Sequence, residues 1–244
     1  VLKEDCLDLP EKIYTTRTIS LTSEQVKAYE EMRRFNITEM DGKTMTSLST
    51  LAALIRLHQI TCGHVTFDDG DTKEIKSNRM NELLNVLDEV DGKVIIWANY
   101  RFDIKKIQQT LSEKFGADSV ATYFGDTKDK DRQDIVEKFQ DKNSSLKYFV
   151  GNPSTGGYGL TLTAAHTVVY YSNSYDLEKR MQSEDRAHRI GQVNKVTYVD
   201  IIAEGTVDEK IVRSLRSKID IASEVMGEDV KNWVIEPIKK RKES

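Results

Sequence analysis

Lys93-Val-Ile-Ile-Trp-Ala98 is a short run of almost continuous apolar residues, the pattern of a strand that is buried on both faces of a sheet. Similar runs recur at Val120–Phe124, Leu146–Val150, Thr167–Tyr171 and Val196–Ile202. Amphipathic stretches with helical spacing separate or follow them, at Met80–Val90, Ile104–Phe115, Asp131–Phe139 and Leu177–Ile190. Because strands alternate with helices, we predict an α/β fold with a doubly wound parallel sheet. In such sheets, ligands meet the loops at the carboxyl ends of the strands.

The residues before this alternating part predict helices joined by a polar loop. Thr22 and Gln25 have the spacing of a helix-capping box, so a helix is expected to begin there. Apolar residues recur at helical spacing through Leu48–Ile60, which predicts a second amphipathic helix. Phe67–Glu74 is polar and predicts an exposed loop or a domain boundary.

After the last expected strand, Thr206 is expected to cap one more helix that runs to about Val225. The basic run Lys239–Lys242 predicts a disordered tail, with a contact to a DNA backbone as the alternative. We therefore expect three divisions: a helical N-terminal part at 1–76, an α/β lobe at 77–205, and a C-terminal helix and basic tail at 206–244.

Composition limits the class of protein. With 244 residues, 38% hydrophobic and 31% charged, the chain can bury a proper core. The net charge of −4 argues against a protein held on nucleic acid by bulk charge, so any DNA contact must be local. Cys6 and Cys62 give no disulfide framework, and no apolar run is long enough to cross a membrane. We expect an intracellular, soluble protein, and the start at Val1 suggests a fragment or a processed chain.

Gln182-Ser-Glu-Asp-Arg-Ala-His-Arg-Ile-Gly-Gln192 has the most informative spacing in the chain. If the segment is helical, Gln182, Arg186 and Arg189 project from one face. Two planar guanidiniums and an amide in a row would suit a polyphosphate. The alternative is a solvated helix whose arginines pair with neighbouring carboxylates.

The string Asp185–Gln192 resembles the last helicase motif of Swi/Snf-type ATPases, the chromatin-remodelling and repair branch of the superfamily-two DNA translocases. The resemblance continues in the family's order through Lys93–Ala98, Gly125–Gln140, Gly156–Ala165 and Gly205–Ile211. It implies that the chain is the second, C-terminal RecA-like lobe of such a motor, preceded at 1–76 by a helical connector and a remnant of the first lobe. The first lobe of the same chain would then carry the groups that mainly hold ATP and Mg²⁺, and double-stranded DNA would be the partner.

The resemblance also implies roles for individual residues. Arg186 and Arg189 would act as arginine fingers on ATP, with Gln182 orienting one of them or the γ-phosphate, while Gly157, Gly159 and Asp185 would lie close to the nucleotide. The contacts to DNA would come from three groups of residues: Asn99, Tyr100 and Arg101; Gly125 and Arg132; Ser154 and Thr155.

These assignments leave alternatives open. Asn99 could cap the next helix while Tyr100 packs on the core, Gly125 and Arg132 could belong to an ordinary turn and surface helix, and the glycines at 156–159 could form only a tight turn. Ser154 and Thr155 replace the basic residue and alanine that are common in the family. The histidines and cysteine of 58–64 lack a second ligand pair, so we expect no metal site.

Two other functions compete with the motor. One is a passive nucleic-acid-binding module, and the other is the lobe of an RNA helicase. Asn173-Ser-Tyr-Asp176 departs from the sequence that remodellers usually carry, so a nucleosome substrate does not follow. On the motor interpretation the protein acts on DNA, whether in a nucleus, a nucleoid or a virus-infected cell. The 244 residues alone are expected to be inactive as an ATPase.

Overall fold

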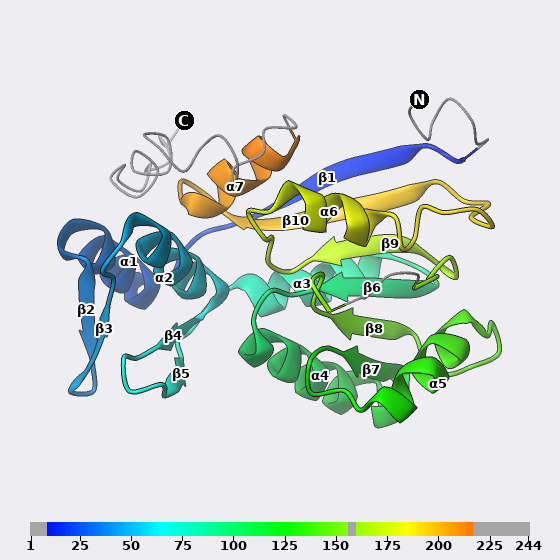
Figure 1. Ribbon diagram of the computed structural model, residues 1–244, viewed down its shortest axis with the longest axis horizontal. Helices are drawn as coiled ribbons and strands as arrows, with labels where there is room; N and C mark the ends of the chain where they lie inside the picture. Colours follow the sequence, from blue (N-terminus) through cyan, green and yellow to red (C-terminus); the bar gives the residue numbers. More distant parts are fainter. Residues whose placement is uncertain (1–8, 156–159, 217–244) are drawn as a thin grey trace. The chain divides into compact units, whose positions relative to one another are not determined.

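A parallel sheet organises the chain in the computed structural model, which describes residues 9–155 and 160–216. Within that range the sheet has six strands in the order β1-β10-β9-β6-β8-β7 (Figure 1). Their bounds are Lys12–Ile19 (β1), Lys93–Trp97 (β6), Val120–Tyr123 (β7), Tyr148–Gly151 (β8), Ala165–Tyr170 (β9) and Val196–Ala203 (β10). The pairs β7–β8, β8–β6, β6–β9 and β9–β10 are all parallel. The parallel sheet predicted from the apolar runs is therefore confirmed.

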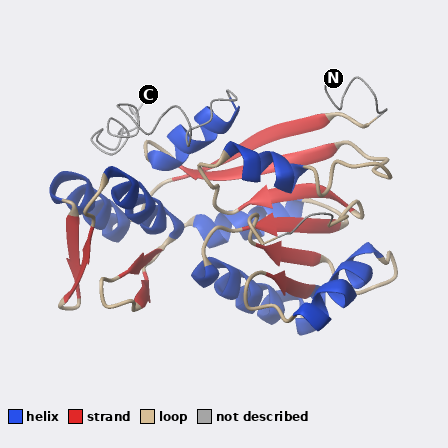
Figure 2. Cartoon of the chain, viewed as in Figure 1, coloured by secondary structure: helices blue, strands red, loops and turns tan. Residues whose placement is uncertain are grey.

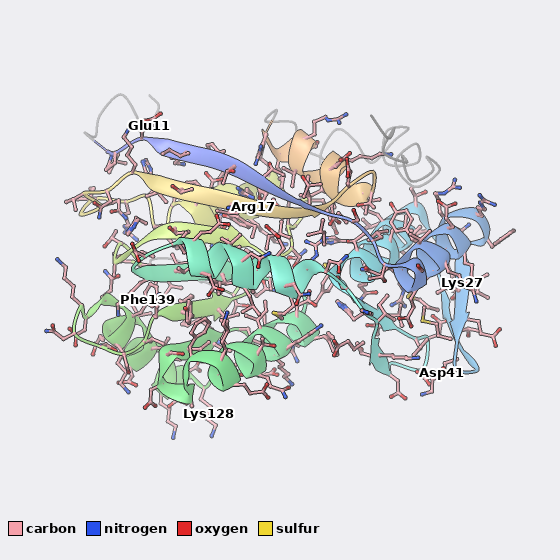
Figure 3. The ribbon with its side chains drawn as sticks, turned by 180° about the vertical axis from the view of Figure 1, so that it is seen from behind. Glu11, Arg17, Lys27, Asp41, Lys128 and Phe139 are labelled. Carbon is pink, nitrogen blue, oxygen red and sulfur yellow. The ribbon has the colours of Figure 1, made fainter. Side chains whose placement is uncertain are left out.

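Helices cover both faces of this sheet (Figure 2). They are α3 (Arg79–Glu89), α4 (Arg101–Phe115), α5 (Asp129–Gln140) and α6 (Leu177–Glu184), and a short 3-10 turn, η2, spans Ala117–Ser119. Figure 1 shows α5 and α6 on the near face of the sheet. Figure 3 shows the chain from behind, and there α4 lies in front. In the same view the labels Lys128 and Phe139 mark the beginning and the end of α5. Alternate side chains of each strand therefore face opposite layers of helices, which is the doubly wound arrangement.

The near-face core is rich in aromatic rings. Trp97 and Phe149 meet edge to face at 6.0 Å between ring centroids, and Phe139 of α5 lies 5.4 Å from Phe149. All three are completely buried, as the apolar runs predict for a two-sided sheet. Leu162 and Ala187 belong to the same cluster, so the segments around them are fixed by core packing.

The chain divides into two compact units. Among the described residues, one unit contains those up to Thr16, Leu83–Ser174 and Glu178–Asp200, and the other contains Arg17–Glu82, Tyr175–Leu177 and those from Ile201 onward. We call them the sheet unit and the helical unit.

The helical unit contains α1 (Ser23–Phe35), α2 (Thr50–Cys62) and α7 (Val207–Arg216), with hairpins β2–β3 (Ile37–Met40 and Lys43–Thr46) and β4–β5 (His64–Thr66 and Thr72–Glu74). Asp41 and Gly42 both have positive φ in the tight turn between β2 and β3, a conformation that favours glycine at the second place. The expected capping box is present at α1, because the Thr22 side chain accepts from the Gln25 N–H while the Gln25 side chain accepts from the Thr22 N–H.

A buried ion pair holds the helical unit together. Arg79 is completely buried, and its guanidinium donates to Asp208 and to the carbonyl of Ile201. Asp208 also accepts from the Thr61 hydroxyl at 2.7 Å. Burial alone would oppose its charge, but Arg79 and then His58 hold the pKa of Asp208 below its ordinary value.

The prediction of one helix over Leu177–Ile190 is wrong, because α6 ends at Glu184. Gln182, Arg186 and Arg189 therefore do not share a helix face. The helix expected at Leu48–Ile60 exists but begins two residues later, after the cap at Ser49. The described part of the helix expected from Thr206 is α7, and the residues after 216, together with Gly156–Gly159, lie outside the described residues.

Candidate functional site

The turn at residues 185–191 follows α6, and tertiary contacts determine where the helix stops. Continuing the helix would require the Arg186 carbonyl to accept a bond from the N–H four residues later. Instead, this carbonyl accepts from the N–H of Leu162 at 2.9 Å. The N–H of Ala187 donates to the carbonyl of Glu184 at 3.2 Å, which is three residues back rather than the four of an α-helix. The backbone thus leaves the helix to meet the residues before β9, and we call residues 185–191 the arginine turn.

Gln192 fastens the end of the arginine turn. Its Nε2 donates to the carbonyls of Ala165 at 2.9 Å, Ala187 at 3.1 Å and Thr163 at 3.2 Å. Its Oε1 accepts from the N–H of Asn194 at 3.0 Å, and the residue is only 6% exposed. One side chain therefore ties the turn to the start of β9, which holds Arg186 and Arg189 on a rigid support.

Arg186 is half-buried, and its guanidinium has no hydrogen bond or ion pair within residues 9–155 and 160–216. Partial burial, and next the charge of Arg189, hold the pKa of Arg186 below its ordinary value. Asp185 and Tyr123 act in the opposite direction. A guanidinium that is partly desolvated and repelled by another guanidinium is suited to bind an added anion.

The other predicted nucleotide residues occupy different positions. Arg189 is exposed and donates weakly, at 3.5 Å, to the carbonyl of Leu160. Gln182 is also exposed, on the surface of α6, where its Nε2 donates to Glu178 at 2.8 Å. The described contacts therefore do not join Gln182 to Arg186. Gly157 and Gly159 lie outside the described residues.

The loops at the carboxyl edge of the sheet are linked by hydrogen bonds. The Asn99 N–H donates to the Ser172 hydroxyl at 2.8 Å, which joins the ends of β6 and β9. The Asn152 side chain donates to the Asn99 carbonyl at 2.8 Å, which joins the ends of β8 and β6. Asn99 does not cap α4, since Tyr100 occupies the cap position and makes no side-chain cap bond. The edge thus presents loops from three neighbouring strands as one connected surface.

Arg101 and Gly125 also lie together at this edge. The Arg101 guanidinium pairs with Asp126 at 3.0 Å, and its Nη2 lies 3.0 Å from the place a side chain on Gly125 would occupy. A side chain at position 125 would therefore only require the exposed end of Arg101 to shift. The Arg101 side chain remains 68% exposed, so it can still reach a phosphate.

Arg132, Ser154 and Thr155 are held by local contacts. Arg132 lies over the ring of Tyr123 at 5.2 Å, donates to the Thr127 carbonyl at 3.2 Å and pairs with Asp129. The N–H groups of Ser154 and Thr155 donate to the side chain and carbonyl of Asn152, at 2.8 and 3.0 Å. These bonds form an Asx turn that fixes both hydroxyl-bearing residues.

Three polar residues of this region were missed by the sequence predictions. Asn152 links the loops, Asn173 lies 4% exposed after β9, and Arg180 of α6 is 6% exposed. Arg180 donates to Glu184 at 2.8 Å, to Asn173 at 2.6 Å and to Asp200 at 2.5 Å, and its guanidinium lies 3.5 Å from the centroid of the Tyr170 ring. The polar pair Ser172-Asn173, which follows the apolar run 167–171, was the available signal.

Residues 9–155 and 160–216 contain no group of three or more His, Cys, Asp or Glu side chains placed to hold a metal ion. In the same part of the chain, no helix is long and apolar enough to span a membrane. Arg186 carries a planar, permanently charged guanidinium, a group that can donate to two oxygens of one phosphate at the same time.

Residues 76–191 match the model of the family "Helicase conserved C-terminal domain". Among curated relatives, the protein named "Putative ATP-dependent helicase/translocase YwqA" of Bacillus subtilis is 30% identical over an alignment of 244 positions. The alignment covers 96% of this chain and 26% of YwqA. Among solved structures, the Sulfolobus solfataricus SWI2/SNF2 ATPase core in complex with dsDNA aligns with a TM-score of 0.68 and 28% identity, covering 90% of this chain and 47% of that one.

The C-terminal part of the Fun30 ATPase domain aligns with a TM-score of 0.71 over 93% of this chain and 96% of that one. At 17% identity this match concerns the fold alone. The chain spans about a quarter of YwqA and about half of the Sulfolobus ATPase core, so it corresponds to one part of these longer proteins.

Proposed function

Because this chain carries the helicase conserved C-terminal domain of Swi/Snf-type ATPases, we propose that it is the second lobe of an ATP-dependent translocase on duplex DNA. The observation that carries the proposal is the half-buried guanidinium of Arg186, which makes no hydrogen bond or ion pair within the described residues. The first lobe, with the groups that hold most of the ATP and Mg²⁺, would come from a longer form of the protein.

Arg186 and Arg189 would donate to phosphate oxygens of ATP held by the first lobe. When bound, ATP supplies the γ-phosphoryl group, and positive charge close to this group favours its transfer to water. The partial burial of Arg186 strengthens its interaction with an anion because the local dielectric is lower than in water. The anchoring by Gln192 allows the guanidinium to be in place before the lobes close.

Duplex DNA would lie along the carboxyl-edge loops. Arg101 is exposed there, and the Ser154 and Thr155 hydroxyls lie on the turn fixed by Asn152. Hydroxyl, amide and guanidinium groups bind phosphate without reading the base sequence, which suits a translocase. The relative from Sulfolobus solfataricus whose ATPase core was solved with dsDNA supports the choice of duplex DNA. On this proposal the protein is associated with DNA, in whichever compartment that DNA lies.

The test uses a longer form of the protein that contains the first lobe. We expect Arg186→Ala and Arg189→Ala each to lower the DNA-stimulated kcat of ATP hydrolysis by about 10³-fold or more, the range for arginine fingers. The exposed Arg34 of α1, which pairs with Glu30 among the described residues, provides the matched control as Arg34→Ala. Wild-type turnover in the Arg186→Ala and Arg189→Ala proteins would remove the finger assignment.

Two further measurements separate the competing functions. Residues 1–244 alone should hydrolyse ATP negligibly, because the resemblance assigns most of the phosphate and Mg²⁺ contacts to the first lobe. In the longer protein, stimulation by duplex DNA above that by RNA of equal length supports a DNA translocase. Greater stimulation by RNA would select an RNA helicase, and no ATPase activity with either would favour a passive binding module.

A further inference from the structure

Three asparagines form a continuous line of hydrogen bonds in the sheet unit, from the DNA-facing loops to helix α6. Asn152 donates to the Asn99 carbonyl at 2.8 Å, and the Asn99 side chain donates to the Asn173 carbonyl at 3.3 Å. Asn173 then accepts from Arg180 of α6 at 2.6 Å. The line begins at the turn with Ser154 and Thr155 and ends on the helix that leads into the arginine turn.

We propose that Asn152 is a positioning residue that transmits DNA contact at the carboxyl edge to Arg186 and Arg189. This inference rests on the proposed function and adds a specific route between the two ligands. Energetic coupling between sites is carried by packed elements and hydrogen-bond chains whose groups have alternative arrangements. In this protein the hydrogen-bond chain consists of the amides of Asn152, Asn99 and Asn173, whose hydrogen bonds can be made or broken.

Each asparagine suits this role because an amide donates and accepts at the same time. All four polar groups of Asn152 are engaged: its N–H with the Tyr123 carbonyl, its carbonyl and Oδ1 with the Thr155 and Ser154 N–H groups, and its Nδ2 with Asn99. A shift of the turn that carries Ser154 therefore changes the bond to Asn99 directly.

The far end of the line is equally constrained. The Asn173 Nδ2 donates to Asp200 at 3.0 Å while its Oδ1 accepts from Arg180. Because Asn173 and Arg180 are both nearly buried, a lost bond there is not replaced easily by water. Displacement of Asn173 is thus passed to α6, and α6 continues into the turn that carries Arg186.

Asn152→Asp breaks the line at one bond. A carboxylate at 152 can still accept from the Ser154 N–H and keep the Asx turn, but it has no proton to donate to the Asn99 carbonyl. Asn152→Ser is the uncharged equivalent, because a hydroxyl also accepts in such a turn but is too short to reach Asn99. Asn143→Asp is the charge-matched control, at an exposed position in the loop before β8.

The experiment measures ATP hydrolysis with and without saturating duplex DNA in the longer protein, together with DNA affinity and the KM for ATP. We expect both Asn152 variants to lower the ratio of DNA-stimulated to DNA-free kcat by about two- to ten-fold, as the loss of one hydrogen bond implies. The DNA-free rate and the KM should stay near those of wild type and of Asn143→Asp. In the uncharged Asn152→Ser protein the affinity for DNA should stay near that of wild type as well.

The outcomes distinguish this inference from the proposed function. If the wild-type protein is not stimulated by DNA, the proposed function fails. If DNA stimulates the wild type and Arg186→Ala abolishes that stimulation, but both Asn152 variants behave as wild type, only the positioning role is wrong. Equal losses in the DNA-free and DNA-stimulated rates would also overturn it, because a purely structural defect lowers both rates together.

Discussion

Arg180 and Arg186 lie on the same stretch of chain, and they are held in opposite ways. The Arg180 guanidinium is nearly buried, bonded to Glu184, Asn173 and Asp200, and packed on the ring of Tyr170. The Arg186 guanidinium is only half-buried, and within the described residues it has no ion pair or hydrogen bond. The backbone beneath Arg186 is nevertheless fixed by Leu162 and Gln192.

The difference separates a structural arginine from one that is available for a ligand. Burying a guanidinium is tolerated when carboxylates and acceptors surround it, and then it fixes the local structure. A guanidinium placed on a rigid turn without a counter-ion keeps its charge for an incoming anion. We infer that α6 is fastened through Arg180 so that the arginine turn can present Arg186 in one position.

The largest expected effect is on Arg180. Replacing it in Arg180→Ala removes the guanidinium that faces the buried Asp200 and Glu184, and should lower the free energy of unfolding by about 3–5 kcal/mol. Urea denaturation of the chain, followed by circular dichroism, measures this. In Arg180→Leu combined with Asp200→Leu the loss should be smaller than the sum of the two single losses, because neither charge is left alone. If Arg180→Ala lowers the free energy of unfolding as little as Arg186→Ala does, the distinction between a structural Arg180 and an available Arg186 is wrong.

The second effect concerns Gln192, which supports the arginine turn. Gln192→Ala leaves three carbonyls without the side chain that donates to them, so we expect a loss of about 1–3 kcal/mol in unfolding free energy. Susceptibility to proteolysis within residues 185–191 should rise at the same time. Unchanged stability would mean that the turn holds its shape without this anchor.

Much of the fold follows from local patterns. The five apolar runs are strands β6 to β10, and the capping box at Thr22 and Gln25 begins α1, because burial on two faces and end-capping act over a few residues. Strand β1 was not predicted. Lys12–Ile19 mixes polar and apolar residues, and its place beside β10 depends on a partner more than 170 residues away.

For the candidate site, the sequence suggested residues but not their geometry. The roles of Arg186 and Arg189, proposed from the string Gln182–Gln192, stay predictions, and the helical spacing wrongly suggested that Gln182 shares their face. The helix ends at Glu184, after which the Arg186 and Ala187 N–H groups bond three residues back, and the Arg186 carbonyl bonds to Leu162 instead of to a following helical turn. A contact with a residue as distant as Leu162 leaves no periodic trace in the sequence. The pairing of Arg180 with Asp200 was missed for the same reason.

Arg186 should contribute little to stability. Since burial and Arg189 lower its pKa, the folded state disfavours the charge of Arg186, so removing it relieves repulsion. We expect Arg186→Ala to change the unfolding free energy by no more than about 0.5 kcal/mol, the usual size for a position without specific contacts. Urea denaturation beside Arg180→Ala is the measurement. A loss of several kcal/mol would show that Arg186 is a structural residue like Arg180.

The smallest effect concerns Gln182, and it decides whether this residue is structural, like Arg180, or available for a ligand, as we infer for Arg186. Its exposed bond to Glu178 joins neighbouring turns of α6, so Gln182→Ala should cost only about 0.2 kcal/mol, the lower range for such pairs. If Gln182 only covers the surface of α6, DNA-stimulated ATP hydrolysis in the longer protein should also remain at the wild-type level. If hydrolysis falls while stability does not change, Gln182 contacts the nucleotide or an arginine finger when the lobes close. Glu178→Ala is the control, since it removes the same bond but leaves the amide free to act.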